Sequence, residues 1–219
     1  MYHPYLTDTS PPTRDTIDHV TRSAPAWVLP GEPAAVRFMN TIWADTSGSH
    51  DDLTTPSALR EWIAVVAERD AKSFGRIGVR DVVEARLLRD AVRRLAAFCT
   101  QDDRAAAQSI VDNIDDAISS VNAAVSHRPA AWIALRGDQL QRERPTQASP
   151  IRTALAELAH DAIDLLTGPT SATLRACHAP GCVLYFVKTH PRREWCSEAC
   201  GNRVRAARHY QRSKAYRSR

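Results

Sequence analysis

Residues 177–203 read CHAPGCVLYFVKTHPRREWCSEACGNR and hold four of the five cysteines of the chain. Cys177 and Cys182 enclose four residues, Cys196 and Cys200 enclose three, and thirteen residues separate the two pairs. Each short turn lets two thiolates face the same point, so the pairs can converge on one tetrahedral ion. Four sulfur ligands favour Zn²⁺, and we expect one structural zinc ion per chain.

Instead of binding zinc, these cysteines could hold an iron–sulfur cluster or form two disulfides. The odd cysteine count and the absence of a signal-like N-terminal segment favour a reducing, cytoplasmic location, and therefore zinc. Four thiolates complete a tetrahedral site, so we expect His178, His190 and His209 to be surface residues rather than ligands. Cys99 lies alone in an apolar stretch and is predicted to be a small core residue.

The residues around the cysteines predict the local structure. Gly181 and Gly201 each adjoin a cysteine, where a tight turn often needs positive φ. The β-branched and aromatic run 183–187 predicts a short strand. No proline follows Ser197, and the spacing of the apolar residues predicts a helix with Cys200 in its first turn.

The charge of the chain is divided unevenly. Residues 175–219 contain 11 Lys/Arg and 2 Asp/Glu, a balance of +9, and the totals of 29 and 25 therefore leave 18 against 23 for residues 1–174. A basic tail can be only a solvated end. A basic helix fixed by a metal site favours nucleic-acid binding, because clustered cations neutralise phosphates. The candidate contact residues are Arg203, Arg205, Arg208, Arg212 and Lys214.

The rest of the chain is predicted to be mainly α-helical. Residues 33–44 form an apolar run, 81–98 and 102–125 repeat apolar residues near the 3.6-residue period, and a polar loop is expected around residues 46–52. Thr55-Pro56 and Ser149-Pro150 each offer an N-cap followed by proline at the first helical position, and Thr167-Gly168 ends the latter helix.

A small β-hairpin interrupts the helices. The segments 131–135 and 140–143 flank Gly137-Asp138, a typical turn pair. We expect Trp43, Trp62 and Trp132 to pack in the core, although they could instead line a ligand pocket. The predicted fold class is thus mainly α with a small β-hairpin, followed by a C-terminal four-cysteine zinc knuckle made of a short strand and a basic helix.

The C-terminal segment resembles the CGNR zinc finger family, through the four cysteines, Trp195 and the tetrapeptide at 200–203. Residues 28–170 resemble the ABATE domain that commonly precedes this finger, through Phe38-Met39-Asn40-Thr41 and the segment 88–92. The resemblance implies a stress-related transcription regulator, with the first domain acting as a sensor or dimerisation unit. We therefore divide the chain into a partly disordered segment (1–27), an ABATE-like domain (28–170) and a CGNR finger with its basic helix (171–219).

The leading hypothesis is a transcription regulator that binds double-stranded DNA, with a small-molecule effector or a second copy of the chain as further expected partners. Recognition of structured RNA by the same helix is an alternative. An enzyme ranks last, because His127, His160, Asp161 and Asp164 form no recognised motif, and no catalytic residue is assigned. No apolar run approaches the roughly 20 residues that span a bilayer, so no membrane partner is expected.

Overall fold

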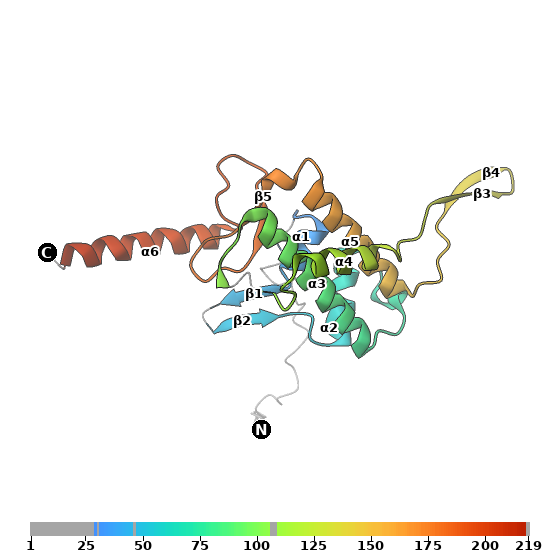
Figure 1. The fold of residues 1–219 in the computed structure, drawn as a ribbon, viewed down its shortest axis with the longest axis horizontal. Coiled ribbons are helices and arrows are strands. Elements are labelled where there is room, and N and C mark those ends of the chain that lie inside the picture. Colours follow the sequence, from blue (N-terminus) through green and yellow to red (C-terminus); the bar gives the residue numbers. More distant parts are fainter. Residues whose placement is uncertain (1–28, 30, 46, 106–108, 218–219) are drawn as a thin grey trace, which may run out of the picture.

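The computed structural model describes residues 29, 31–45, 47–105 and 109–217 (Figure 1). The segment 1–27, which was expected to be partly disordered, lies outside the described residues. A body of packed helices occupies the centre of the molecule, and a hairpin and the C-terminal helix project from it in opposite directions. Within the described residues, no helix is long and apolar enough to cross a membrane.

The body is built on α3, which packs against α4 and α5, while α1 packs against α3 and α5. The mainly helical fold class is confirmed. The helices are α1 (Ala34–Met39), α2 (Pro56–Val66), α3 (Val79–Thr100), α4 (Ile114–Val125), α5 (Pro150–Thr167) and α6 (Glu198–Arg217), with short 3-10 turns at Ala71–Phe74 and Ser171–Thr173.

The strands form three separate antiparallel pairs among the described residues. The pair β3–β4 is the predicted hairpin, and β6 is the predicted strand of the cysteine segment. The bounds are β1 (Ile42–Asp45) with β2 (Gly48–Asp51), β3 (Trp132–Arg136) with β4 (Gln139–Glu143), and β5 (Leu174–Ala176) with β6 (Tyr185–Val187).

Two helix starts follow the predicted capping chemistry. The Thr55 hydroxyl accepts a hydrogen bond from the backbone N–H of Ala58 at 3.1 Å, and the Ser149 hydroxyl accepts one from Arg152 at 3.4 Å. Proline occupies the next position in each case, where its fixed φ suits the first helical turn. These caps place α2 and α5 as the sequence predicts.

Two helix predictions were wrong in extent. The helix expected over 33–44 ends at Met39, and the chain turns into the β1–β2 hairpin in place of the expected polar loop. The helix expected from Asp102 begins only at Ile114, because the side chain of Asn113 caps its first turn. Apolar residues continue through both breaks, so periodicity alone extended the helices too far.

Two core assignments were wrong. Cys99 is exposed, and Trp132 is exposed on the projecting hairpin. Trp62 is only partly buried, but it packs on the main core and its ring lies 5.3 Å from that of Phe38. Trp43 is half-buried and stacks on His50 rather than packing in the main core.

The main hydrophobic core crosses the predicted domain boundary. Leu174, Ala176, Tyr185 and Val187 of the β5–β6 pair belong to the same buried cluster as the helices. A second cluster holds the four cysteines together with Phe186 and Val204, and residues of β1 pack against it. The sheet beside the cysteines therefore has one face in the helical core and the other over the metal site.

Candidate metal centre

The four cysteines converge on one point. All four are buried, and their Sγ atoms lie within 4.8 Å of one another. The Sγ atoms of Cys182 and Cys196 are 3.8 Å apart, and those of Cys196 and Cys200 are 3.4 Å apart. These distances exceed the roughly 2.05 Å of a disulfide bond, and all four cysteines are free.

The arrangement fits a tetrahedral ion. With metal–sulfur bonds of about 2.3 Å, tetrahedral geometry requires sulfur atoms about 3.8 Å apart, which matches the observed spacing. Four protein ligands close the coordination sphere, as in structural rather than catalytic sites. When bound, the ion would cross-link the two cysteine pairs. His178, His190 and His209 are all exposed, as expected of residues outside such a site.

The cluster favours loss of protons from some of its thiols. A hydrogen bond with Cys182 lowers the pKa of Cys177 to about 7. Hydrogen bonds with the other thiols, Cys177 first, hold the pKa of Cys200 far below its usual value, and the guanidinium of Arg203 adds to this shift. The Arg203 Nη2 donates to the Cys200 Sγ at 2.9 Å. Hydrogen bonds with the neighbouring thiols, Cys177 first, raise the pKa of Cys182 and of Cys196, so the cluster without an ion favours two thiolates beside two thiols. Thiolates are the form that binds metal, and binding would displace the remaining protons.

The two glycines beside the cysteines act differently from one another. Gly181 has a φ of 71°, so the first turn uses the positive φ that glycine allows. Gly201 is helical, and the prediction of positive φ there was wrong. A Cβ at Gly201 would lie 3.3 Å from the Trp195 ring, so a larger residue there would require the ring to move by a few tenths of an ångström.

Arg104 reaches the first cysteine turn from the helical domain. Its Nη1 donates to the carbonyl oxygens of Cys177 and Cys182, the latter at 2.8 Å. The same guanidinium forms a two-point ion pair with Asp102, and Asp102 accepts a hydrogen bond from the Tyr185 hydroxyl at 3.0 Å. Burial alone would raise the pKa of Asp102, but the bonds from Arg104 lower it. Arg104 thus ties both ends of the turn to the helical domain.

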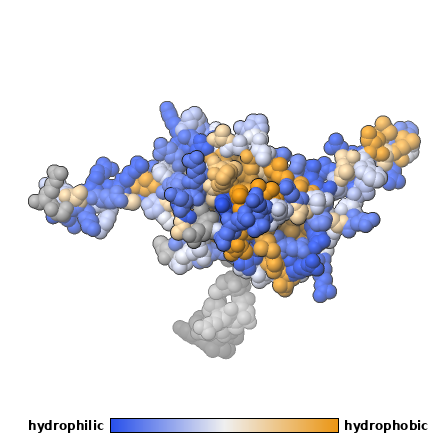
Figure 2. All heavy atoms as spheres, in the orientation of Figure 1, coloured by the Kyte–Doolittle hydropathy of each residue, from blue (hydrophilic) through white to orange (hydrophobic). Residues whose placement is uncertain are grey.

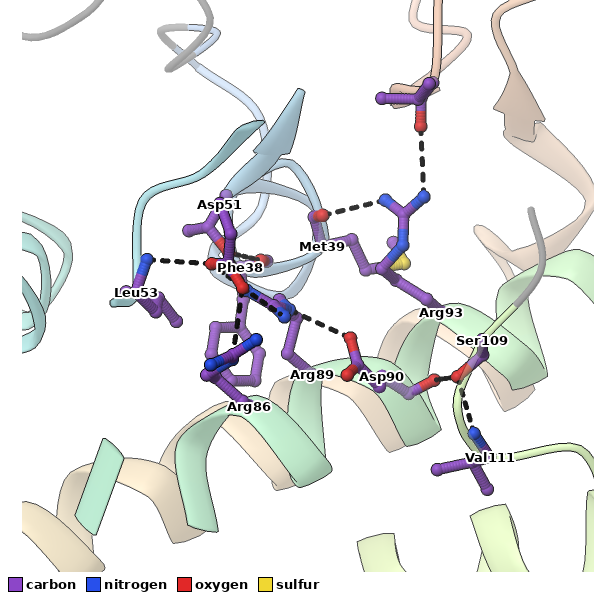
Figure 3. A network of polar contacts seen from close by, with 12 residues as sticks. Phe38, Met39, Asp51, Leu53, Arg86, Arg89, Asp90, Arg93, Ser109 and Val111 are labelled. Atoms are coloured by element: carbon purple, nitrogen blue, oxygen red, sulfur yellow. Dashed lines mark hydrogen bonds and ion pairs between the residues drawn. The ribbon is translucent and has the colours of Figure 1, made fainter. Parts of the chain in front are cut away.

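Arg93 is a second link and is almost fully buried. It donates to the carbonyl oxygens of Met39 in α1 and Val183 beside the cysteine turn (Figure 3). Asn40 also crosses this boundary, because its side-chain amide bonds both the N–H and the carbonyl of Tyr185 at 2.9 Å. Asn40 therefore satisfies backbone groups of a strand 145 residues away in the chain.

The second cysteine turn is held by Arg193. Its guanidinium donates to the carbonyl oxygens of Val187 and Cys196 at 3.0 Å and pairs with the buried Glu32 at 2.6 Å. The other carboxylate oxygen of Glu32 accepts from the Val187 N–H at 2.9 Å. A buried ion pair and hydrogen bonds to backbone carbonyls favour one geometry, so both cysteine turns have preset positions.

A further ionic network lies in the body beneath β2. Arg89 is buried, and it pairs with Asp51 and with its neighbour Asp90, each at a distance of 3.0 Å (Figure 3). Arg86 forms a third ion pair in this network, with Asp51. Most contacts of this network and of the metal-site links lacked a sequence signal, because their partners lie far apart in the chain, from 38 residues for Arg89 with Asp51 to 155 residues for Glu32 with Val187.

The basic helix α6 starts inside the metal site and leaves the body. Cys200, Gly201 and Val204 are its buried residues, and every residue beyond Ala207 except the half-buried Ser213 is exposed up to Arg217. Figure 2 shows this helix as a hydrophilic projection. Of the predicted contact residues, Arg203 points back to Cys200 and Arg205 bonds Asn202, whereas Arg208, Arg212 and Lys214 lie on the exposed part.

The residues considered for catalysis do not converge. His160 and Asp164 are 3.5 Å apart on the surface of α5, with Asp164 largely exposed. His127 borders a hollow beside α3, and His160 borders another next to Arg128 and Pro129. The site that the described residues assemble is therefore the four-cysteine centre with its basic helix.

A helical domain that holds a four-cysteine centre and a projecting basic helix has the architecture of a zinc-finger protein. Residues 32–169 match the ABATE family, described as "putative stress-induced transcription regulator", and residues 173–213 match the CGNR zinc finger. The first match covers more than half of the chain, so the protein belongs to the ABATE family and carries a CGNR finger behind that domain. No curated protein matches the chain.

Proposed function

We propose that this protein is a transcription regulator that binds double-stranded DNA through α6, with one structural Zn²⁺ held by Cys177, Cys182, Cys196 and Cys200. The observation that carries the proposal is the way the helix starts. Its first turn supplies one of the four metal ligands, and its exposed part carries cations with no acidic residue after Glu198. A fixed start gives a basic helix a defined direction, as docking into a groove requires.

The arginines of α6 divide into two roles. Arg203 neutralises the metal thiolates, so its contribution to DNA binding is indirect. Arg205, Arg208 and Arg212 are spaced at i, i+3 and i+7 and share one side of the helix, where they can reach base edges or phosphates. Lys214 and Arg217 follow on the last turns and suit phosphate contacts.

The zinc assignment is tested by metal analysis of protein purified without chelator. We expect one zinc per chain, retained in Cys99→Ser and lost in Cys196→Ser plus Cys200→Ser. Cys99 is exposed and distant in sequence from the cluster, so it is the matched control. Protein without zinc, or full zinc in the double variant, would overturn the assignment.

DNA binding is tested by selecting duplexes from a randomised library with the zinc-loaded protein. Affinity for the selected and for random duplexes is then measured at several salt concentrations. Arg208→Ala should weaken selected more than random DNA, by about tenfold or more if the residue reads a base. Truncation after Ser213 should weaken both and flatten the salt dependence. Gln211→Ala, an exposed neutral change on the same helix, is the control and should have little effect.

Two outcomes decide against this function. If no duplex is enriched and none binds at low salt, DNA binding is overturned. If structured RNA competes better than the selected duplex at equal salt, the same helix serves RNA recognition instead. Both matched families are regulatory or zinc-finger types, which supports a role other than catalysis.

We place the effector part of this proposal at a hollow of about 420 Å³ between α1, α2 and α5. Ile63, Val66 and Leu158 supply apolar lining, and Asp161 lies at the same hollow. Burial, followed by the nearby Glu157, raises the pKa of Asp161. A ligand with an apolar part and a polar group that hydrogen-bonds the Asp161 carboxyl group fits this hollow. Screening for compounds that raise the melting temperature, with Val66→Trp to fill the hollow as the negative variant, tests this placement.

A further inference from the structure

The hairpin β3–β4 exposes large apolar side chains far from the body. Trp132, Ile133, Leu135 and Leu140 have 63%, 80%, 66% and 74% of their surface exposed. Figure 2 shows the hairpin as a hydrophobic projection opposite α6. An isolated two-stranded hairpin is marginally stable in water, and a third strand or a packed face is normally required. The hairpin thus has the composition of an element that is completed by a partner.

The register collects the aliphatic residues on one face. Leu135 lies directly opposite Leu140, and Ile133 lies two residues before Leu135, so all three side chains share a face of the hairpin. The opposite face carries Trp132 and Arg136. Residues 132–143 contain neither proline nor lysine, the residues that commonly protect an exposed strand edge.

The outer edge of β3 has backbone groups available for pairing. The loop between the strands has two residues, and Gly137 has the positive φ of 65° that such a turn requires. Arg136 and Gln139 beside the loop therefore exchange backbone hydrogen bonds with each other. Along the ladder, such hydrogen-bonded pairs alternate with non-hydrogen-bonded pairs. Ile133 and Leu135 consequently direct their N–H and carbonyl groups away from β4.

The sequence of β3 is complementary to itself about Ala134. If a second β3 runs antiparallel to the first with Ala134 opposite Ala134, Ile133 of one copy lies opposite Leu135 of the other. The backbone N–H and carbonyl groups of these two residues then point towards each other and can form hydrogen bonds between the copies. On the other face, Trp132 lies opposite Arg136, a pair suited to a cation–π contact. The small side chain of Ala134 occupies the two-fold axis, where the strands approach most closely.

We propose that two copies of this chain associate through β3, forming a four-stranded antiparallel sheet in the order β4, β3, β3, β4. Its continuous aliphatic face combines Ile133, Leu135 and Leu140 from both copies. A symmetric contact of this kind is closed, so it yields a dimer rather than a filament. The contact is confined to the hairpins and therefore belongs with small interfaces, below about 1,200 Å². We expect a dimer that dissociates on dilution.

The first test is sedimentation velocity of the full-length, zinc-loaded protein over a range of micromolar concentrations. The unmodified chain should pass from monomer to dimer. Ile133→Asp should raise the dissociation constant at least about tenfold, because it places a charge among the aliphatic residues of the sheet. Val79→Asp, at an exposed residue of α3, is the matched control and should leave the dimer unchanged.

The second test fixes the register and is independent of DNA binding. In a Cys99→Ser background, Ala134→Cys should form a disulfide between copies under oxidised glutathione, because non-hydrogen-bonded partners have Cα atoms about 4.5 Å apart. Gln141→Cys on β4 should not, because its counterpart would be about 14 Å away across three strand spacings. A chain that stays monomeric at all concentrations, or equal cross-linking of the two variants, overturns the proposal. A monomeric chain would assign the hairpin to another partner or to the body of its own chain, and equal cross-linking would show contact between copies without this register.

Discussion

Arg104 shows how a single residue outside the cysteine segment shapes the metal centre. It donates hydrogen bonds to the carbonyl oxygens of both Cys177 and Cys182. It also forms an ion pair with Asp102, whose side chain is fully buried. Groups that orient metal ligands from outside the coordination sphere commonly contribute 10-fold to 100-fold to metal affinity. A preset turn reduces the entropy that the cysteines lose when they bind the ion.

We therefore predict that Arg104→Lys lowers zinc affinity by about tenfold in competition with a chromogenic chelator. Lysine keeps a charge for Asp102 but cannot bond two carbonyls and a carboxylate in the same plane. Circular dichroism should remain that of the parent protein, which separates this effect from unfolding. Arg94→Lys changes a half-buried arginine of the same region, whose guanidinium bonds the Asp112 carbonyl, and should leave affinity intact. Unaltered affinity in Arg104→Lys would remove this role.

At the scale of elements, sequence signals were reliable where they were local. Thr55 and Ser149 cap their helices, Gly137-Asp138 turns the hairpin, and Cys200 lies in the first turn of its helix as the spacing predicts. The β1–β2 hairpin was missed because Ile42 to Ala44 extend the apolar run of α1. Its strands are short and partly exposed, and Trp43 bonds the Asp52 side chain across the hairpin.

The two ends of α6 differ in how they are stabilised. Its first turns are buried in the metal site, whereas the residues from Arg208 to Arg217 are exposed, apart from the half-buried Ser213. Helices of this length without packing are marginal in water, and the repulsion between like charges opposes them further. The far half of α6 should therefore open easily in the free protein.

Hydrogen exchange measured by mass spectrometry checks this behaviour. We predict rapid amide exchange for 208–217 and slow exchange for 198–204 in the zinc-loaded protein, with protection spreading outward when a duplex is bound. A polyanion such as heparin is the control for charge alone. Slow exchange along the whole of α6 without a ligand would show that something else supports the helix.

At the scale of the whole molecule, the boundary near residue 170 marks a change in sequence family rather than a break in packing. The pair β5–β6 contributes Tyr185 and Leu174 to the helical core, and Arg93, Asn40 and Glu32 bond backbone groups of the cysteine segment. The cysteine spacing predicted the ligand cluster, because each pair is local. Contacts between residues up to 155 positions apart could not be predicted, because no pattern within one sequence pairs them.

The same contacts determine what metal removal should do. A four-cysteine segment taken alone has too little core to fold without its ion, so one expectation is that chelation unfolds only this segment. The shared core and the buried arginines favour a different result. Loss of the ion frees β6, and the helical body then loses the packing of Tyr185 and the partners of Arg93. Buried groups left without partners typically cost about 1–3 kcal/mol each.

We therefore predict that chelation lowers the melting temperature of the entire chain instead of removing one separate transition. The measurement is calorimetry with and without zinc, followed by circular dichroism at 222 nm and by tryptophan fluorescence. Both signals should shift together, and added zinc should restore them. Cys196→Ser plus Cys200→Ser should behave like the chelated protein, while Cys99→Ser serves as the control. A helical transition that keeps its midpoint after zinc is removed would mean that the two parts fold independently, despite the arginine links between them.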